Sequence, residues 1–237
     1  VCGGSRGIGR AIALGFAAAG GDVSICARDP KALEATRAEI AKLGRKAHAA
    51  SADLSKGDAV RGYVRDALAA LGGVDLLVNN ASAFGSSDDE AGWTSSLAVD
   101  MMAIVHATQE AHPALKKSQG SVVNISSISA LHPAARQPPY GAIKAAAIHY
   151  TVTQAAMYAK DRIRVNCIAP GSVDFPGSIW DRRKTENPAL YNGTLASIPF
   201  GRFGTPEEIA NVALFLASPL ASWVTGQAIA VAGAQGL

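Results

Sequence analysis

The chain has 237 residues, of which 49% are hydrophobic, and this is enough to bury the core of one α/β domain. Lysine and arginine total 22 against 19 acidic residues, and this small, evenly spread excess argues against a nucleic-acid or membrane-surface protein. Three cysteines without zinc-like spacing predict neither a disulfide framework nor a metal site. With no signal segment at the start and no bilayer-length apolar run, we expect a cytoplasmic protein.

Short apolar or β-branched runs alternate along the chain with longer alanine-rich segments of helical spacing. This alternation is typical of βα units around a parallel sheet. The predicted strands are 22–27, 46–50, 74–79, 121–126, 162–168 and 227–231, and the predicted helices are 8–19, 31–43, 58–71, 89–116, 140–160 and 206–216. We therefore predict a single α/β domain over residues 1–237, with a Rossmann-type doubly wound parallel sheet between two layers of helices.

Three local features refine this prediction. Val1 stands directly before a glycine-rich loop, where a nucleotide-binding fold has a full first strand, so we expect that strand to be truncated and residues to precede Val1. The run Thr-Pro-Glu-Glu at 205–208 is a helix start, with a hydroxyl cap, a proline and a carboxylate three residues after the cap. Only the segment 172–204 breaks the alternation, and we predict that it forms a substrate-binding insert or lid.

A glycine-rich loop, GGSRGIG, occupies residues 3–9 between a strand and a helix. Glycines at such a turn let the backbone approach a pyrophosphate, and the following helix N-terminus favours its negative charge. Many loops have three glycines in seven residues and bind nothing, so the glycines are weak evidence by themselves, but the position of this loop between strand and helix supports a dinucleotide site. The loop residues predicted to contact the cofactor are Gly3, Ser5, Arg6, Gly7, Ile8 and Gly9.

The choice between the two nicotinamide cofactors depends on the end of the strand 22–27. NAD-binding folds place a carboxylate there for the ribose hydroxyls, but this chain has Ala27 followed by Arg28. With Arg6 in the loop as well, the pocket is suited to the extra phosphate of NADP(H). Each arginine alone is also typical of a solvated surface charge. We predict a preference for NADP(H), with NAD(H) as the alternative cofactor.

The loop 3–9, the pair Asp53-Leu54 and the run Asn79-Asn80-Ala81-Ser82 resemble the cofactor-side motifs of the short-chain dehydrogenase/reductase family. The resemblance covers essentially the whole chain, and within the family it is broadly to the 3-oxoacyl-[acyl-carrier-protein] reductase-like branch. It implies that Asp53 hydrogen-bonds the adenine, that Asn79 steadies the central strand and that the backbone near Ala81 flanks the adenosine ribose. The neighbouring Leu54 and Asn80 are predicted to line the same cofactor site.

A candidate catalytic group lies further along the chain. Tyr140 and Lys144 are four residues apart in a predicted helix, so they share one face of it. Ser127 follows the strand 121–126, at the sheet edge where doubly wound folds bind ligands. Hydride transfer to a carbonyl leaves charge on its oxygen, which a phenol of ordinary pKa, about 10, protonates poorly at neutral pH. A nearby ammonium such as Lys144 is expected to lower the phenol pKa.

This order of strand, serine, tyrosine and lysine is similar to the catalytic signature of the same family. The resemblance implies that Tyr140 is the general acid in reduction and the base in oxidation. It also implies that Ser127 hydrogen-bonds the substrate oxygen and that Lys144 binds the nicotinamide ribose. Asp100 aligns with an asparagine that supports a proton relay in the family through its main chain and a bound water. A carboxylate at this position is expected to add negative charge near Lys144 and to perturb the relay.

The turn at Pro170 and Gly171 resembles the family's turn that touches the nicotinamide. By the same similarity, the backbone of Val173 is a predicted contact for the carboxamide. Phe175 stands where the family often has threonine, which puts one side-chain hydrogen bond to the nicotinamide or pyrophosphate in question.

The segment 172–204 offers two interpretations of the substrate. One is an apolar pocket, and the other is an anionic group such as a phosphopantetheine or CoA thioester. The basic run is also typical of a solvated helical face, which is the simpler interpretation. The aromatic candidates are Trp180, Tyr191 and Phe200, and the basic candidates are Arg182, Arg183 and Lys184.

Together these features predict an NADP(H)-dependent oxidoreductase that transfers hydride between the nicotinamide and a carbonyl or secondary alcohol. The expected substrate is a small carbonyl or alcohol compound or an acyl thioester, and a 3-oxoacyl thioester reductase is the specific alternative. A cofactor-sensing regulator of the same fold would be expected to lose Tyr140 or Lys144, and both are present. An isomerase or dehydratase would usually need a longer substrate domain. We expect a homodimer or homotetramer, without nucleic acid, membrane or metal partners.

Overall fold

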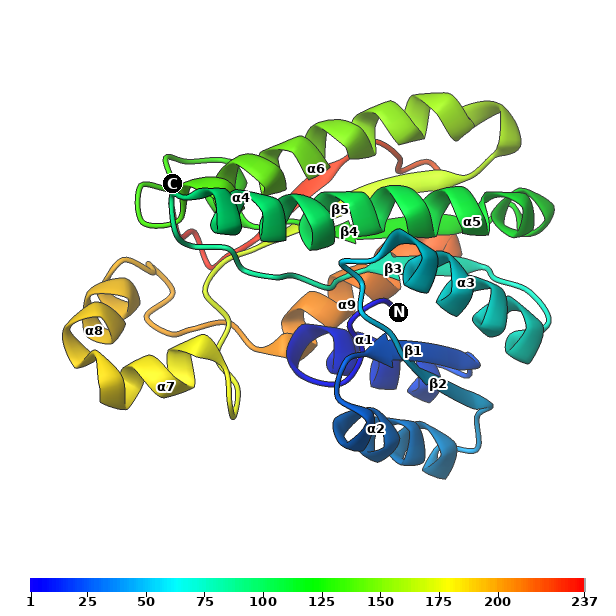
Figure 1. Cartoon of the computed structure of the whole chain (residues 1–237), viewed down its shortest axis with the longest axis horizontal. Helices are drawn as coiled ribbons and strands as arrows, with labels where there is room; N and C mark the ends of the chain where they lie inside the picture. Colours follow the sequence, from blue (N-terminus) through cyan, green and yellow to red (C-terminus); the bar gives the residue numbers. More distant parts are fainter. Residues whose placement is uncertain (237) are drawn as a thin grey trace.

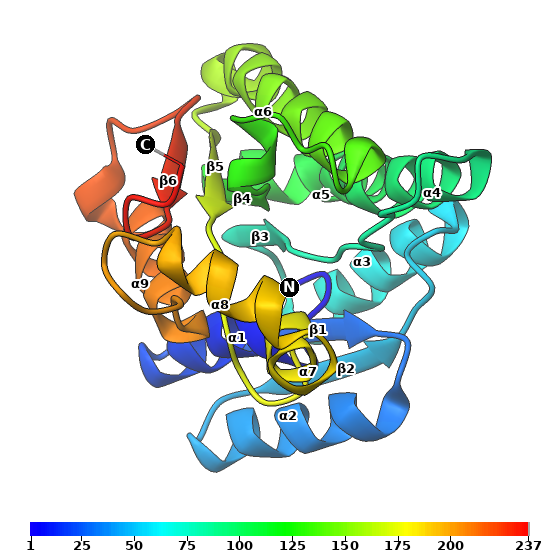
Figure 2. The ribbon, with the colours of Figure 1, turned by 90° about the vertical axis from the view of Figure 1, so that its left-hand side faces the viewer.

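Six parallel strands form the sheet in the computed structural model, which describes residues 1–236. In this range the strands are β1 (Val23–Ala27), β2 (Ala47–Ser51), β3 (Leu76–Asn79), β4 (Ser121–Ile125), β5 (Arg164–Pro170) and β6 (Ala228–Val231). β2 pairs with β1, and β3, β4, β5 and β6 follow one another in that order (Figure 2). Cys2 forms parallel bridges to both Cys26 and Asn79, so this one residue joins the two groups of strands.

Away from Cys2, β1 and β3 do not pair. A cavity of about 1050 Å³ separates them, and its lining includes Val23 and Ser24 of β1 and Leu77 and Val78 of β3. The cavity lies towards the amino ends of the strands, whereas the glycine loop follows Cys2 at the opposite, carboxyl edge.

Two helical layers cover the sheet. α1 (Gly7–Ala18), α2 (Pro30–Lys42) and α9 (Pro206–Ala217) lie on one face, and α3 (Gly57–Leu71), α5 (Ala103–Ser118) and α6 (Pro138–Tyr158) lie on the other (Figures 1 and 2). Apolar residues bury both faces of the central strands, as expected for a parallel sheet. Val122 and Val165 belong to the core beneath α3, α5 and α6, whereas Val123 and Ile168 belong to the core beneath α1 and α9. The predicted three-layer fold is confirmed.

The start of α9 is as predicted from the residues at 205–208. The Thr205 hydroxyl accepts a hydrogen bond from the Glu208 amide, and the Glu208 carboxylate accepts one from the Thr205 amide. This capping box satisfies two amide groups that the helix itself leaves unbonded. Three single-turn 3₁₀ helices also occur, at Ile128–Ala130, Ala159–Asp161 and Pro219–Ala221. Within residues 1–236 no helix combines the length and apolar character needed to cross a membrane.

The prediction of one helix over 89–116 is wrong. The segment comprises α4 (Glu90–Ser96), a π-helix (Leu97–Met102) and α5. Asp100 lies in the π-helix, is fully buried, and accepts a hydrogen bond from the Ala83 amide at 3.1 Å. Such π turns insert one residue into a helix and reorient its side chains, often at functional sites. The departure from regular α-helical spacing therefore coincides with the buried contacts that Asp100 makes with distant residues. Sequence periodicity alone does not reveal such contacts.

The segment 172–204 contains two helices that sequence periodicity did not predict. They are α7 (Ile179–Glu186) and α8 (Pro188–Ala196). Ser178 caps the first and Asn187 caps the second. Both helices are too short for periodicity to indicate them, although their cap residues are visible in the sequence. α7 and α8 pack on each other and project from the body of the molecule (Figures 1 and 2).

Candidate active site

Four predicted catalytic residues meet at the carboxyl edge of the sheet. Ser127 follows β4, Tyr140 and Lys144 lie one turn apart on α6, and Asp100 comes from the π-helix. Each of these residues is at most 9% exposed to solvent. The Lys144 ammonium lies 5.6 Å from the centroid of the Tyr140 ring. The fold thus gathers a hydroxyl, a phenol, an ammonium and a carboxylate in one buried place.

Lys144 is held by contacts from two sides. Its ammonium donates a hydrogen bond to the Ile125 carbonyl at 2.9 Å and lies 2.9 Å from Asp100 Oδ1. Its own carbonyl accepts a hydrogen bond from the Ser126 hydroxyl at 2.8 Å. Burial has the largest single effect on the pKa of Lys144 and would lower it, but the Asp100 carboxylate together with Tyr140 and Cys167 outweighs burial, and the pKa is raised. Lys144 is therefore a fixed cation at neutral pH.

The expectation that Lys144 lowers the Tyr140 pKa needs correction. Lys144 and the Ser127 hydroxyl do act in that direction, yet burial raises the pKa of Tyr140 by more, and Asp100 raises it further. The Phe84 ring contributes to this burial, because its centroid lies 4.8 Å from that of the Tyr140 ring. No sequence motif points to Phe84, which follows the run at 79–82 and has a left-handed backbone, with φ of 53°. In the protein without ligands the phenol stays protonated at neutral pH.

The glycine loop has the conformation that a pyrophosphate requires. Gly3 and Gly7 have positive φ angles of 87° and 53°, and a side chain at Gly9 would collide with the Gly3 carbonyl oxygen. Asn80 fixes that carbonyl with a 2.8 Å hydrogen bond from its side-chain amide. No side chain caps the start of α1, so its first amide groups are available to an anion. These residues fit a dinucleotide.

The residues predicted around the adenosine lie at the neighbouring strand ends. Arg6 and Arg28 are both exposed, and neither forms an ion pair with a carboxylate within residues 1–236. Asp53 accepts hydrogen bonds from the Ser55 amide and hydroxyl, which lower its pKa. Leu54 is buried, and the Ala81 backbone lies against Gly3 of the loop. Ser5 lies within the loop, and Ile8, at the start of α1, packs on the core.

The segment after β5 approaches the glycine loop. Pro170 ends β5, Gly171 follows it, and Val173 forms a parallel bridge to Gly204, which closes the two ends of the insert on each other. The Phe175 ring packs so closely on Gly7 that any side chain there would overlap it. Sequence reasoning treated Phe175 as the loss of one hydrogen bond and missed this contact. Phe175 therefore joins the predicted nicotinamide side to the phosphate loop.

A buried polar network supports the strands beneath the site. The Asn79 side chain donates to Asn124 Oδ1 at 2.8 Å, and Asn124 donates in turn to the Thr151 hydroxyl at 2.9 Å. These bonds link β3, β4 and α6, the elements that carry the cofactor-side run, Ser127 and Tyr140. Asn124 and Thr151 were missed by sequence analysis, because isolated polar residues in apolar runs do not reveal their partners.

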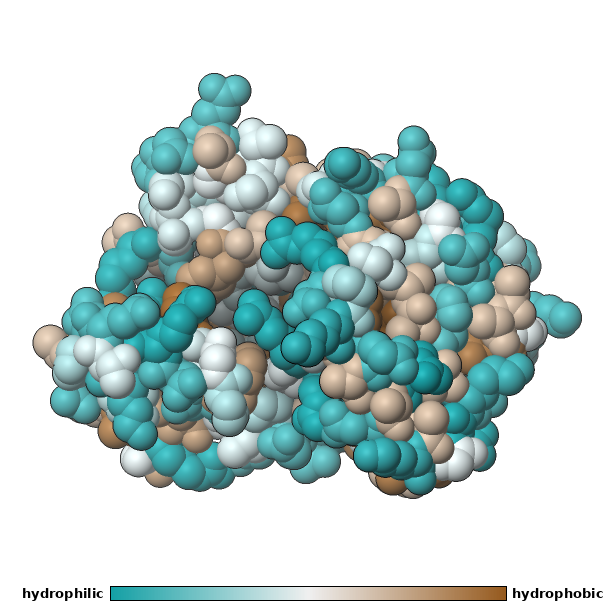
Figure 3. Space-filling model, turned by 60° about the horizontal axis from the view of Figure 1, so that its bottom comes forward, coloured by the Kyte–Doolittle hydropathy of each residue, from teal (hydrophilic) through white to brown (hydrophobic). Residues whose placement is uncertain are grey.

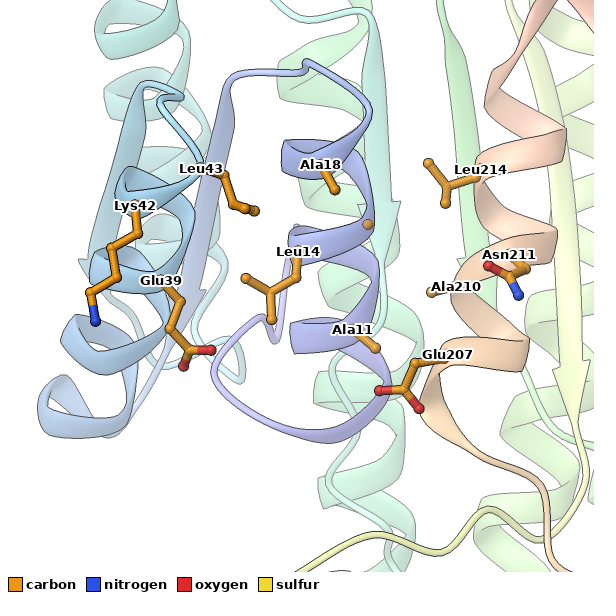
Figure 4. Close-up of a pocket in the computed structure, with 11 residues that line it drawn as sticks. Ala11, Leu14, Ala18, Glu39, Lys42, Leu43, Glu207, Ala210, Asn211 and Leu214 are labelled. Carbon is orange, nitrogen blue, oxygen red and sulfur yellow. The ribbon is translucent and has the colours of Figure 1, made fainter.

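The molecule is hollowed in two different places outside the sheet. Figure 3 shows a hollow where α7 and α8 project, with hydrophilic residues around its rim. A separate groove of about 550 Å³ crosses α1 between α2 and α9, with Leu43 on the side of α2 and Leu214 on the side of α9 (Figure 4). Glu39 at its edge is ion-paired with Arg10. None of the predicted site residues lines this groove.

Comparisons with known proteins agree with this geometry. The family model described as enoyl-(acyl carrier protein) reductase matches residues 3–234. A 3-oxoacyl-[acyl-carrier-protein] reductase of Chlamydia muridarum is 38% identical, covering 98% of this chain and 94% of that protein. The structure of L-sorbose reductase from Gluconobacter frateurii, complexed with NADPH and L-sorbose, is 30% identical with a TM-score of 0.91 and covers 99% of this chain and 94% of that one.

A second solved structure holds a different cofactor and substrate from the sorbose reductase structure. A 7α-hydroxysteroid dehydrogenase complexed with NADH and 7-oxo glycochenodeoxycholic acid is 32% identical over 99% of this chain and 93% of that one, with a TM-score of 0.91. The match to the family model covers nearly the whole chain, and the fold is shared with both structures. This chain belongs to the short-chain dehydrogenase/reductase family of nicotinamide-dependent oxidoreductases.

Proposed function

We propose that this oxidoreductase prefers NADP(H) and reduces a carbonyl group by hydride transfer from the nicotinamide, with Tyr140 as the proton donor to the carbonyl oxygen. The observation that carries the proposal is the buried group of Ser127, Tyr140 and Lys144 beside a glycine loop of dinucleotide-binding geometry. When bound, the nicotinamide supplies or accepts the hydride. The predicted cofactor contacts of Gly3, Asn80, Asp53 and the residues around them are part of the same proposal.

The protein's own groups then handle the proton. The Ser127 hydroxyl hydrogen-bonds the substrate oxygen and polarises the carbonyl. Tyr140 donates its phenolic proton to that oxygen as charge develops on it, and Lys144 stabilises the phenolate that remains. Burial keeps the phenol protonated at neutral pH, which suits the acid role in reduction. In the oxidative direction the same phenolate would remove the alcohol proton.

A 3-oxoacyl thioester is the first specific substrate to test. The Chlamydia muridarum relative is named for this reaction, whereas the sorbose and steroid enzymes are named for other substrates. NADPH and NADH consumption should be followed with a ketone, an aldehyde, a sugar ketose and a 3-oxoacyl thioester. Turnover with NADPH supports the proposal and ranks the substrates. Binding of NADPH without turnover of any carbonyl would instead favour a cofactor-sensing regulator.

Arg28 is expected to select the phosphate of NADP(H). Replacing it by alanine removes a charge-assisted hydrogen bond to that phosphate, so the Kd for NADPH should rise about 10-fold or more. The Kd for NADH should stay unchanged or fall. NADH has no phosphate for Arg28 to contact, and Ala27 provides no carboxylate for the ribose hydroxyls in either protein. Fluorescence titration of both cofactors measures this. The control is Arg37→Ala on α2, where the arginine is already paired with Glu34. Unchanged NADPH affinity without any gain for NADH would contradict the preference.

Asp100 is expected to set the pH range of the reaction. Its charge raises the Tyr140 pKa, so Asp100→Asn should lower that pKa. Oxidation needs the phenolate, and its rate rises as pH passes the phenol pKa; the rise should therefore move to lower pH. For reduction, the alkaline fall should move the same way. Of the other groups around Lys144, Cys167 is kept neutral by burial, which raises its pKa to about 11. Profiles of kcat against pH measure the shift.

A matched variant removes the same charge elsewhere. Asp66 is exposed on α3, so Asp66→Asn should leave both limbs of the profile where they are. A profile for Asp100→Asn that coincides with that of the unchanged protein would show that Asp100 does not act on the phenol.

We also propose that the chain forms a homodimer or homotetramer. Large apolar side chains are exposed along α4, the π-helix and α6, which pack on one another. Burying such a surface is the usual driving force for association. Sizing at micromolar concentration should therefore give at least twice the 24.3 kDa of one chain, and a monomer would contradict the proposal. The exposed residues are Trp93, Leu97, Met102, Val152 and Met157.

A further inference from the structure

The segment that follows β6 folds back over the carboxyl end of β5. β6 is the outermost strand beside β5, and Pro170 pairs with Val231 at their ends (Figure 2). The Gly171 amide donates a 3.0 Å hydrogen bond to the Val231 carbonyl. A side chain at Gly171 would overlap the side-chain oxygen of Gln235. The segment 232–236 is therefore packed directly on the turn that follows β5.

One side chain of this segment holds the turn with two hydrogen bonds. Gln235 Oε1 accepts a hydrogen bond from the Ser172 amide at 2.8 Å, and Gln235 Nε2 donates one to the Ser172 hydroxyl at 3.1 Å. The Ser172 carbonyl accepts a third hydrogen bond, from the Gly204 amide at 2.9 Å. The amide, the carbonyl and the hydroxyl of Ser172 are therefore all bonded within the protein, to Gln235 and Gly204.

The backbone of the segment is bent so that Gln235 reaches this position. Gly233 and Ala234 have consecutive positive φ angles of 57° and 65°. Such an angle is unfavourable for alanine, and it persists where the surrounding contacts determine it, often near functional sites. Here the Gln235 amide donates a 3.0 Å hydrogen bond to the Ala232 carbonyl, which closes the bend. The segment therefore accepts an unfavourable backbone conformation at the residue before Gln235.

Phe200 also contacts this segment. Its amide donates a 3.3 Å hydrogen bond to the Gly233 carbonyl, and its side chain lies against Gly233 and is 71% exposed. The sequence grouped Phe200 with Trp180 and Tyr191, but those two rings pack on Phe203 instead, with centroid distances of 5.1 and 4.8 Å. Phe200 therefore attaches the far end of the insert to the segment after β6.

The turn after β5 lies between the glycine loop and the catalytic group. On one side, the Ser126 amide donates a 2.8 Å hydrogen bond to the Ile168 carbonyl, which sets the end of β5 beside the strand end that carries Ser127. On the other side, the Phe175 ring packs on Gly7 of the glycine loop. A dinucleotide with its pyrophosphate on that loop must pass this turn to bring its nicotinamide to a carbonyl at Ser127. The turn therefore borders the nicotinamide half of the cofactor.

We infer that Gln235 is a positioning residue for the nicotinamide half of the cofactor. By holding Ser172, it fixes the backbone of the turn against which the nicotinamide ring is placed. The adenosine half does not depend on this contact, because Arg28 and Asp53 follow β1 and β2, on the other side of the sheet. The inference rests on the proposed function, because it needs a nicotinamide that reaches a carbonyl at Ser127.

The test measures the binding of the whole cofactor and of its adenosine half. Gln235→Met keeps the length of the side chain but loses both hydrogen bonds to Ser172. The Kd for NADPH should rise about 5- to 100-fold, which is the effect of two hydrogen bonds. The Kd for 2′,5′-ADP, which has the adenosine half without the nicotinamide, should stay unchanged. NADH and 5′-AMP form the corresponding pair if the protein binds NADH more tightly. Calorimetry measures these constants without turnover.

A second glutamine provides the matched control. Gln227 is exposed just before β6, and its side chain donates a 3.0 Å hydrogen bond to the Thr225 carbonyl, so Gln227→Met should change neither Kd. The inference stands if Gln235→Met weakens binding of the cofactor but not of its adenosine half, even where no carbonyl is reduced. If carbonyls are reduced and Gln235→Met binds the cofactor like the unchanged protein, the proposed function stands and the inference is overturned. Equal weakening of both ligands would indicate a general loss of structure and would also overturn it.

Discussion

Replacing Tyr140 by phenylalanine is expected to lower kcat by about 10²- to 10⁴-fold, the usual contribution of a positioned general acid. The phenol is buried against Phe84 and lies beside Lys144, so its proton has a defined path to a substrate oxygen at Ser127. Phenylalanine keeps the ring and its packing, and NADPH affinity should therefore change little. Steady-state kinetics with the best substrate, together with a cofactor titration, measure both quantities.

The same helix provides a matched control. Tyr150 is a half-buried tyrosine on α6, ten residues after Tyr140. Tyr150→Phe removes the same hydroxyl from the same element and should leave kcat within about twofold, because surface substitutions away from a site have small effects. If Tyr140→Phe kept nearly full activity, the proton would have to come from another group, and the role assigned to Tyr140 would be wrong.

The sequence was sufficient for those parts of the fold that depend on local pattern. Alternating apolar runs predicted the strands to within about two residues, and the capping residues at 205–208 predicted the start of α9. The glycine positions and the spacing of Tyr140 and Lys144 likewise predicted which residues meet at the site. Each of these signals lies within one element or one turn, where the spacing of residues determines the geometry.

Features that depend on contacts between residues far apart in the chain could not be predicted from the sequence. The π-helix around Asp100 follows from contacts with Ala83 and Lys144, which lie seventeen and forty-four residues away. The raised pKa of Tyr140 follows from burial by neighbours such as Phe84, and a residue spacing says nothing about burial. In each case the decisive interaction joins separate elements.

The ion pair between Asp100 and Lys144 should have a large effect on stability. Lys144→Met leaves the Asp100 carboxylate fully buried without its counter-ion, and breaking a buried pair in this way costs about 3–5 kcal/mol. The free energy of unfolding, from urea titration of the protein without cofactor, should fall by that order. Turnover should be lost as well, because no cation remains to stabilise the phenolate.

A second substitution separates the two consequences. In the double variant Lys144→Met/Asp100→Asn, the neutral amide can still accept the hydrogen bond from the Ala83 amide, and no buried charge remains. Stability should therefore recover relative to Lys144→Met, and with the single variant Asp100→Asn the double-mutant cycle should give a coupling of about 0.5–3 kcal/mol, as expected for residues in contact. Activity should not recover, because the ammonium is still missing. If the two losses of stability simply added, the carboxylate and the ammonium would be energetically independent, and Asp100 could not act on Tyr140 through this pair.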